Sequence, residues 1–437
     1  MTDSRVAAYN VLKAVEHDGA YSPKVLDIEI KKAQLSRADA SFVSALVYGT
    51  LEKQHLLDYY IEAMLVRRED KIGLEARIVL RMAAYQLLFM DKVPDFSAIN
   101  EAVELIKSEK PKKAGFVNGV LRSLTRQKDN VILPSKEEDM TAYLSVRYSV
   151  IPWIAKLWQR EFGDEIAEKI LCACEKRPTL NVCVNTLKTD ADKLIKELES
   201  EGVSAVKSEL FDDCIHIENT GSIDGIKAYD KGMFYVQDEA SRFLCHVFGA
   251  KPGERVMDVC SAPGGKSFTL ARLMDNKGEI ISRDISDKKL RLVSGGARRL
   301  GIDIISTFAA DAATATDLPI CDRVLCDVPC SGLGVIRRKP EIRYKQYTDV
   351  ERLPPVQSAI LQTSSAALSS GGVLMYSTCT LRHLENLDIV ERFLKNHPDF
   401  EPLPYINPFT GESEWNTTLL PCNNNTDGFF TARLVKI

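Results

Sequence analysis

Residues 255–273 read RVMDVCSAPGGKSFTLARL and predict a strand, a tight turn and a helix in direct succession. The apolar run at 255–259 has the length of a buried strand, and a helical pattern follows near 265–274. Gly264 and Gly265 in the turn allow a ligand to approach the backbone closely, and the first turn of the helix offers free N–H groups. This pattern is typical of a parallel sheet that binds a ligand at its strand ends.

The same alternation continues to the end of the chain. Further strands are predicted at 279–282, 302–308, 323–326 and 372–376, and helices near 286–300, 355–370 and 383–396. Strands alternating with helices in this rhythm indicate an α/β fold with a mostly parallel, doubly wound sheet. In such a sheet the functional side chains follow the carboxyl ends of the strands.

The chain before residue 237 is organised differently. Residues 1–128 show apolar positions at i, i+3 and i+4 and predict an all-helical bundle, which ends in a polar linker. Further helix and then short strands predict a small α+β module; the strands are expected near 179–184, 203–206, 215–217 and 233–236. We therefore expect three domains, at residues 1–130, 131–236 and 237–437.

Composition agrees with a multidomain globular protein. The 437 residues are 45% hydrophobic and 27% charged, which excludes collagen-like, low-complexity and wholly disordered classes. No apolar run approaches the roughly eighteen residues of a membrane span, and acids interrupt the N-terminal apolar positions, unlike a signal peptide. We expect a cytoplasmic protein whose eleven cysteines are reduced. The net charge of −4 gives no indication of a nucleic-acid partner.

Carboxylates follow four successive predicted strands, at Asp258, Asp284, Asp311 and Asp327. A single acid is more often a helix cap, but four that meet at one edge indicate a ligand with a nucleoside part. The loop is not a phosphate loop, because Cys260 occupies the position of a required glycine. A positively charged adenosine cofactor such as S-adenosyl-L-methionine satisfies both conditions.

Two cysteines follow the fourth and fifth predicted strands. Cys330 lies in DVPCSGLG at 327–334, and Cys379 lies in YSTCT at 376–380. A single cysteine is usually structural, but a pair at the functional edge of a sheet suggests chemistry. A zinc deaminase is excluded because no second cysteine follows Cys330 three positions on, and we expect no metal.

A basic segment follows Cys330. It holds Arg337, Arg338, Lys339, Arg343 and Lys345, with tyrosines interleaved that could stack on bases. Such a segment beside two thiols favours RNA or DNA as the substrate. We therefore predict RNA contacts at Arg337, Arg338, Lys339 and Arg343.

Four ordered motifs resemble the RNA cytosine-5 methyltransferases of the NSUN/Sun class. They are DVCSAPGGKS (258–267), DVPCSGLGVIRRKP (327–340), YSTCT (376–380) and DGFFTARL (427–434). Near the N-terminus, LVYGTLE (46–52) and FVNGVLRS (116–123) resemble the antitermination factor NusB. The resemblance covers essentially the whole chain. It implies a NusB-like RNA-binding helical domain, a small α+β module and a Rossmann-like class I methyltransferase domain.

The resemblance also implies a reaction and a site. The reaction is S-adenosyl-L-methionine-dependent methylation of C5 of a cytosine in 16S rRNA, at the nucleotide numbered 967. The implied cofactor residues are Asp258, Cys260, Ser261, Ala262, Pro263, Gly264, Gly265, Lys266, Asp284, Asp311 and Asp327. Cys379 would add to cytosine C6, Cys330 would assist product release, and Asp327 would contact the base. Thr380, where Ser is usual after the nucleophile, keeps the hydroxyl.

Two other functions compete with this one. The first is cytosine methylation of another RNA such as tRNA. The second is a non-catalytic RNA-binding antitermination or assembly factor, against which the intact cysteine pair argues. If the function is methylation of 16S rRNA, we expect a monomer that acts on small-subunit rRNA, with no membrane or metal partner.

Overall fold

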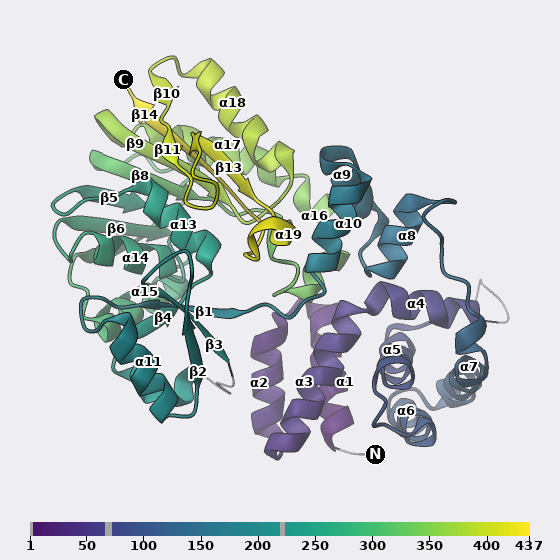
Figure 1. Ribbon diagram of the computed structural model, residues 1–437. Coiled ribbons are helices and arrows are strands. Elements are labelled where there is room, and N and C mark those ends of the chain that lie inside the picture. The colour runs from purple at the N-terminus through teal and green to yellow at the C-terminus, as the bar shows by residue number, and fades with distance from the viewer. Residues whose placement is uncertain (1–2, 66–71, 219–222) are drawn as a thin grey trace. The chain divides into compact units, whose positions relative to one another are not determined.

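The computed structural model describes residues 3–65, 72–218 and 223–437, which form two compact units (Figure 1). The first unit runs to Leu171 and also includes Lys339–Lys345. The second unit comprises Cys172–Arg338 and Gln346–Ile437. The chain therefore passes from the second unit into the first and back again within a short loop. The boundaries at residues 130 and 236 stay a prediction.

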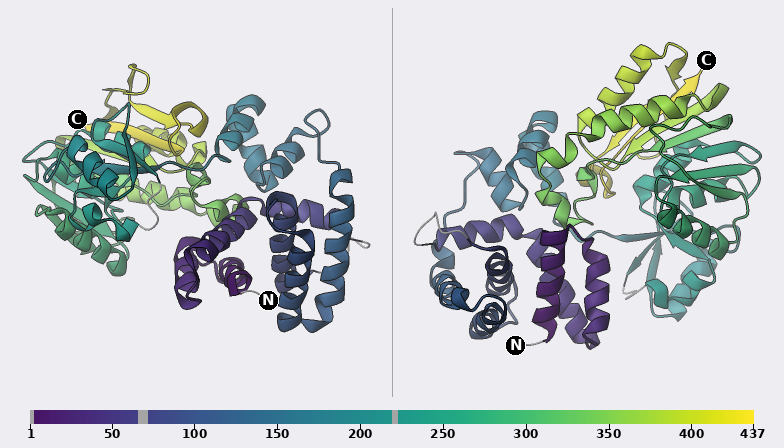
Figure 2. Two further views of the ribbon diagram at one scale, coloured as in Figure 1. Left: turned by 60° about the horizontal axis from the view of Figure 1, so that its bottom comes forward. Right: turned by 180° about the vertical axis from the view of Figure 1, so that it is seen from behind.

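The first unit is helical, as the sequence predicts (Figure 2). Its helices are α1 (Asp3–Asp18), α2 (Ser22–Lys32), α3 (Arg37–Glu52), α4 (Gln54–Ala63), α5 (Leu74–Phe89), α6 (Asp95–Glu109), α7 (Ala114–Gln127), α8 (Met140–Arg147), α9 (Pro152–Phe162) and α10 (Asp164–Ala173). Helix α5 contributes Ile78, Val79, Leu80 and Ala83 to a core shared by α1 to α7. A helix with apolar residues on nearly all sides needs such surroundings.

A small antiparallel sheet opens the second unit. Its strands are β1 (Leu180–Val184), β2 (Ser204–Lys207), β3 (Cys214–Glu218) and β4 (Phe234–Val236), in the order β2-β3-β1-β4. Helix α11 (Ala191–Ser200) covers the sheet through Leu194 and Leu198, and the short helix α12 (Lys227–Asp230) adds Ala228 to the same core. These elements form the α+β module that the sequence predicts.

The large sheet carries the site. Its main strands are β5 (Arg255–Asp258), β6 (Glu279–Asp284), β7 (Ile305–Ala309), β8 (Cys321–Asp327), β9 (Leu368–Thr378), β10 (Phe400–Pro402) and β14 (Phe429–Lys436). They follow the order β10-β14-β9-β8-β5-β6-β7, and β13 (Asn416–Leu419) pairs with β14. Strands β5 to β9 are parallel, whereas β14 is antiparallel to β9. The mostly parallel sheet is thus confirmed, but the strands after β9 were not predicted.

Helices cover both faces of this sheet. They are α13 (Glu239–Phe248), α14 (Gly265–Leu273) and α15 (Asp287–Leu300) on one face, and α17 (Leu353–Ser365) and α18 (Leu387–Asn396) on the other (Figure 2). Successive strand residues point to opposite faces, so Val256 packs with the first set and Met257 with the second. The remaining short elements are α16 (Tyr347–Val350), α19 (Pro421–Asn424), β11 (Tyr405–Ile406) and β12 (Ser413–Glu414).

Across the three described ranges, no helix is both long enough and apolar enough to cross a membrane.

Candidate active site

The four predicted carboxylates lie at neighbouring strand ends. Asp327, Asp258 and Asp284 are the last residues of β8, β5 and β6, and Asp311 follows β7. These strands are adjacent and parallel in the order β8-β5-β6-β7. The carboxylates therefore form a row along one edge of the sheet, where an α/β fold binds its ligand.

The loop after β5 is held tightly against β6. The Ser261 N–H donates to the Arg283 carbonyl at 2.8 Å, and the Gly264 N–H donates to the Ser261 carbonyl at 2.8 Å. Gly264 has φ of +113°, and a Cβ atom there would lie 2.5 Å from the Phe268 ring. Only glycine fits this position. The loop contains a cis peptide between Ala262 and Pro263, Pro263 is exposed, and Gly265 opens α14.

Unpartnered polar atoms are buried at the base of this loop. The Asp258 carboxyl is 1% exposed and accepts a hydrogen bond from Ser267 Oγ at 2.7 Å through Oδ2. Among the described residues, Asp258 Oδ1 and Ser261 Oγ have no hydrogen-bond partner. Burial raises the pKa of Asp258 to about 7. Buried polar atoms normally have partners, so these two fit a polar ligand bound against the loop.

Gln237 is a candidate that sequence reasoning missed. This buried residue follows β4, and its Oε1 accepts a hydrogen bond from Thr269 Oγ1 at 2.6 Å. Its Nε2 has no partner in the described part of the chain and lies 3.6 Å from where a Cβ atom of Gly265 would be. Gln237 therefore adds a third unpartnered polar group at the start of α14. Its position just after the last strand of the small module gave no signal in the sequence.

Asp284 and Asp311 are each oriented by a turn. Asp284 is half-buried, and its Oδ1 accepts from the Ser286 N–H at 2.9 Å. Asp311 is exposed, and its Oδ1 accepts from the Ala313 N–H at 2.9 Å. One carboxylate oxygen is thus used to fix the side chain, and the second oxygen can face a ligand.

Cys260 differs from the other residues of the loop. Its side chain packs against the apolar core that lies under α17 and α18. Burial raises the pKa of its thiol well above the usual value. Because the side chain packs against the core, we expect Cys260 to contribute to a ligand site through its backbone.

Lys266 joins the loop to the next strand. Its Nζ lies 2.6 Å from Asp327 Oδ2, and Ser377 Oγ donates to Asp327 Oδ1 at 2.9 Å. Although burial opposes the charge, the Asp327 carboxylate raises the pKa of Lys266. Lys266 thus holds Asp327 in place between the loop and the thiols.

The two predicted thiols meet at the ends of β8 and β9, which are neighbours in the sheet. Cys330 Sγ and Cys379 Sγ are 3.2 Å apart, and both residues are partly exposed. The hydrogen bond with Cys379 and burial together raise the pKa of Cys330 well above its usual value. A Cβ atom on Gly334 would lie 2.0 Å from the Gly428 carbonyl oxygen, so glycine allows the loop after Cys330 to approach β14.

Three of the four predicted basic RNA contacts have internal hydrogen-bond acceptors. Arg337 is 7% exposed and donates to Asp427 Oδ1 at 2.8 Å, and Arg338 donates to Asp427 Oδ2 and to Asp238 Oδ2, both at 2.6 Å. Arg343 is 3% exposed and donates to the Tyr148 carbonyl within the helical unit. Internal acceptors therefore give these three guanidinium groups a structural role, and RNA contact by the three arginines stays a prediction.

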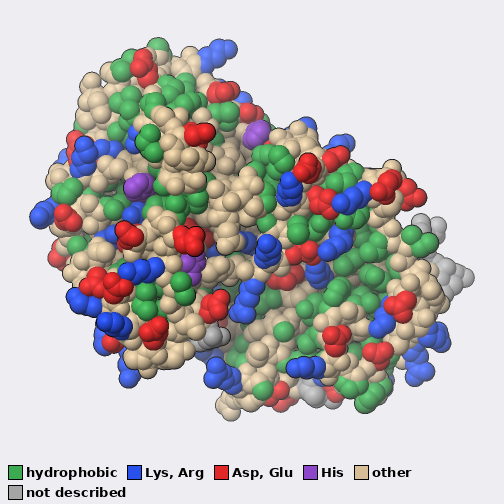
Figure 3. All heavy atoms as spheres, in the orientation of Figure 1, with side chains coloured by type: hydrophobic (Ala, Val, Ile, Leu, Met, Phe, Trp, Pro, Cys, Tyr) green, Lys and Arg blue, Asp and Glu red, His purple; other side chains and the backbone are tan. Residues whose placement is uncertain are grey.

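Lys339 is the exception in this segment. It is exposed, with its Nζ 5.7 Å from the centre of the Tyr21 ring. Elsewhere on the visible surface, Lys and Arg side chains are interspersed with Asp and Glu and gather in no single large patch (Figure 3). Lys339 thus stays a predicted RNA contact.

The described ranges contain no group of three or more His, Cys, Asp or Glu side chains arranged to hold a metal ion.

A mostly parallel sheet with a row of carboxylates and a glycine-rich loop at its strand ends defines the class of Rossmann-like folds. Family models refine this class. The model described as 16S rRNA methyltransferase RsmB/F matches residues 246–435, the NusB family model matches 2–126, and a RsmF/B-like ferredoxin-like domain matches 152–224. The predicted NusB-like region and methyltransferase fold are thereby confirmed.

Relatives match over the full length. Probable ribosomal RNA small subunit methyltransferase B of Bacillus subtilis is 36% identical, covering 100% of this chain and 99% of the relative. The protein with the same description from Synechocystis is 31% identical and covers 100% of both chains. The crystal structure of PH0851 has a TM-score of 0.85 at 27% identity and covers 100% of this chain and 99% of that one. The chain belongs to the ribosomal RNA small subunit methyltransferase B family.

Proposed function

We propose that the protein transfers a methyl group from S-adenosyl-L-methionine to C5 of a cytosine in 16S rRNA, the nucleotide numbered 967. The observation that carries the chemistry is the thiol pair, with Sγ atoms 3.2 Å apart at neighbouring strand ends beside Asp327. The names of the full-length relatives, methyltransferases of small-subunit rRNA, support the substrate.

The row of carboxylates and the loop after β5 fit the cofactor. Asp258 Oδ1 and Ser261 Oγ are buried and have no partner in the described ranges, so they can bind polar groups of a ligand. Asp284 and Asp311 would accept hydrogen bonds from the ribose and from adenine. When bound, the cofactor supplies an electrophilic methyl group.

Cys379 activates the base. Cytosine C5 is a poor nucleophile, but addition of the Cys379 thiolate to C6 forms an S–C6 bond and moves an electron pair toward C5. The choice of Cys379 over Cys330 as the attacking thiol follows from the resemblance of YSTCT (376–380) to the NSUN/Sun class. Asp327, held by Lys266 and Ser377, would accept hydrogen bonds from the base and favour the charge that develops on addition.

Cys330 assists the last step. After methylation the C5 proton leaves to a base and the S–C6 bond breaks, which restores the aromatic ring and frees Cys379. The Sγ of Cys330, 3.2 Å from that of Cys379, is close enough to help both events. The target base must leave its stack before a thiol can approach C6.

Two cysteine variants test these roles. We expect Cys379→Ala to abolish turnover and to form no covalent RNA adduct, and Cys330→Ala to accumulate an adduct that survives a denaturing gel. Cys172→Ala, which changes an exposed thiol of α10, is the matched control and should behave as the wild type. An adduct with Cys379→Ala and none with Cys330→Ala would reverse the two assignments.

Bisulfite sequencing tests the substrate. A strain lacking the protein should lose one cytosine methylation in 16S rRNA, and the purified enzyme with S-adenosyl-L-methionine should restore it. Loss of a tRNA signal instead would identify a methyltransferase of another RNA. An unchanged map, with no cofactor binding by calorimetry, would identify a non-catalytic factor.

A further inference from the structure

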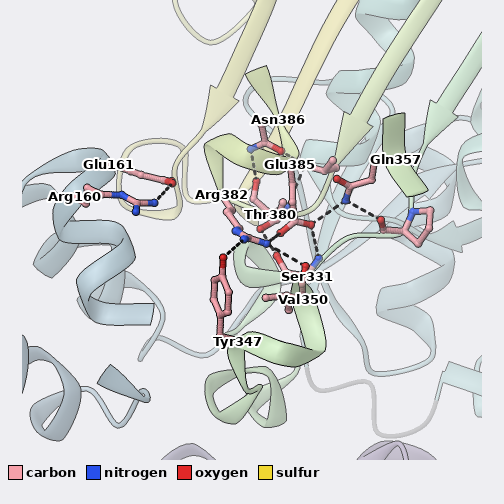
Figure 4. Close-up of polar contacts among 12 residues, drawn as sticks. Arg160, Glu161, Ser331, Tyr347, Val350, Gln357, Thr380, Arg382, Glu385 and Asn386 are labelled. Atoms are coloured by element: carbon pink, nitrogen blue, oxygen red, sulfur yellow. Dashed lines mark hydrogen bonds and ion pairs between the residues drawn. The ribbon is translucent and has the colours of Figure 1, made fainter. Parts of the chain in front are cut away.

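Glu385 and Asn386 are consecutive residues that contact both thiol loops. They lie between β9 and α18 and are 0% and 1% exposed. Figure 4 shows their side chains among Ser331, Gln357 and Thr380, with dashed lines to these partners. Neither residue belongs to the row of carboxylates or to the cofactor loop.

Glu385 holds the backbone on both sides of Cys330. Its Oε2 accepts from the Ser331 N–H at 2.8 Å and from Gln357 Nε2 at 2.9 Å. Gln357 Nε2 also donates to the Pro329 carbonyl at 3.0 Å. The residues before and after Cys330 are therefore bound to one buried pair of side chains.

Asn386 does the same for Cys379. Its Nδ2 donates to the Thr380 carbonyl at 3.0 Å, and its Oδ1 accepts from Thr378 Oγ1 at 2.5 Å. One amide thus fixes the residues before and after the second thiol. Because the side chain is buried, loss of either bond would leave a polar group without water.

Direct bonds also join the two loops. The hydroxyls of Ser331 and Thr380 are 2.7 Å apart, and the Gly334 N–H donates to the Cys379 carbonyl at 3.0 Å. The charge of Glu385 is offset by Arg382, which is 3% exposed and has Nη1 3.4 Å from Glu385 Oε1. A buried network with this many bonds limits the arrangements open to its members, although Gln357 Oε1 has no partner among the described residues.

We propose that Glu385 and Asn386, acting through Gln357, Ser331 and Thr380, are positioning residues that fix the separation of the two thiols. This inference rests on the proposed roles of Cys379 and Cys330. The bonds end on atoms that flank each cysteine, so they set where each Sγ stands relative to C6 and C5 of the base. Displacement of a reacting group by about 1 Å can cost about 100-fold in rate.

Gln357→Met removes the donor to Pro329 and Glu385 while keeping the length of the side chain. We expect turnover to fall by about 10- to 100-fold with a larger fraction of covalent RNA adduct, because release depends on Cys330. Gln362→Met, an exposed site on the same helix, is the control and should behave as the wild type. Turnover and adduct equal to this control would overturn the inference.

A double variant tests whether Gln357 acts through Cys330. In a Cys330→Ala background, Gln357→Met should lower turnover no further, because the group it positions is already absent. Independent, multiplying losses would contradict a positioning role.

Thr380 provides a second route in case Gln357→Met fails to fold. Thr380→Ser keeps the hydroxyl and should retain nearly wild-type turnover, whereas Thr380→Val should lose it at unchanged melting temperature. Equal turnover of the two variants would overturn the inference.

Thiol reactivity separates this inference from the proposed function. In the ligand-free protein, alkylation by iodoacetamide, followed by mass spectrometry, should change several-fold at Cys330 relative to Cys379 in Gln357→Met. If the ratio changes but Cys330→Ala traps no RNA adduct, the proposed function fails and the positioning network stands. If the alkylation ratio is unchanged but Cys330→Ala traps an RNA adduct, the proposed function stands and the positioning network fails.

Discussion

Asp258 gives the site a dependence on pH. Burial raises its pKa from 3.8 to about 7, so the folded protein keeps a proton there that the unfolded chain releases near pH 4. Stability of the ligand-free second unit should therefore fall as the pH rises from about 4 to about 7, and this contribution should be constant above that. Each pKa unit corresponds to about 1.4 kcal/mol.

Asp258→Asn tests this dependence. The free energy of unfolding of the variant should not fall between about pH 4 and pH 7. At pH 8 the variant should be more stable than the wild type by about 1 to 4 kcal/mol. It should bind no S-adenosyl-L-methionine. Hydrogen exchange of the β5 and β8 amides at pH 5, 6 and 8 measures the difference. Parallel profiles for wild type and variant would show that Asp258 does not titrate in this range. Asp303→Asn, at an exposed position of the same unit, serves as the control.

Some site residues could be predicted from the sequence and others could not. Asp258, Asp284 and Asp327 follow from strand order, because parallel topology brings successive strand ends to one edge. Gln237 accepts a hydrogen bond from Thr269, which lies 32 residues further along the chain. No local sequence pattern predicts such a pair. The ion pair of Arg337 could not be predicted, because its countercharge, Asp427, lies 90 residues further along the chain.

At the scale of elements, the alternation of strand and helix patterns in the sequence predicted the strands that are followed by helices. It missed β14, which returns antiparallel beside β9 with Val435 opposite Val373. The helix predicted at 355–370 is also too long, because α17 ends at Ser365. Strand β9 begins at Leu368, where it pairs with Cys321 of β8. Pairing with distant strands decides these boundaries, and the hydrophobic periodicity of one segment carries no information about that pairing.

Three helices of the first unit are joined by a buried ion cluster. Arg81 of α5 is 4% exposed; its Nη1 donates to Glu16 of α1 at 2.7 Å and its Nε to Asp58 of α4 at 2.7 Å. These acids raise the pKa of Arg81 although burial opposes the charge. The cluster therefore fixes how α1, α4 and α5 pack.

Arg81→Ala should destabilise the helical unit by about 1 to 3 kcal/mol, because it removes a buried guanidinium and leaves two partly exposed carboxylates without their partner. Hydrogen exchange of amides in α1, α4 and α5 measures the loss. Arg37→Ala, at an exposed position that begins α3, should change stability by less than about 0.5 kcal/mol. A similar small change for Arg81→Ala would mean that packing alone holds these helices.

At the scale of the whole molecule, one short segment lies between two parts of the second unit in sequence but belongs to the first unit. Residues 339–345 follow the Cys330 loop in sequence but pack within the helical unit, where the Trp153 indole donates to the Lys345 carbonyl at 2.8 Å. The basic residues that suggested a nucleic-acid surface in this segment are largely used to hold it there. We propose that exposed cations of the NusB-like helices also contribute to RNA binding.

Helix α7 carries Arg122 and Arg126 one turn apart, and both are exposed. If this face contacts phosphates, Arg122→Glu with Arg126→Glu should weaken 16S rRNA binding at low salt and reduce the slope of log affinity against log salt by about one to two. Filter binding between about 50 and 200 mM salt measures both quantities. Lys196→Glu, on an exposed position of α11, controls for net charge and should leave the slope nearly unchanged. Equal slopes for all three proteins would instead assign the helical unit a purely architectural role, because a surface that neutralises no phosphate releases no counterions on binding.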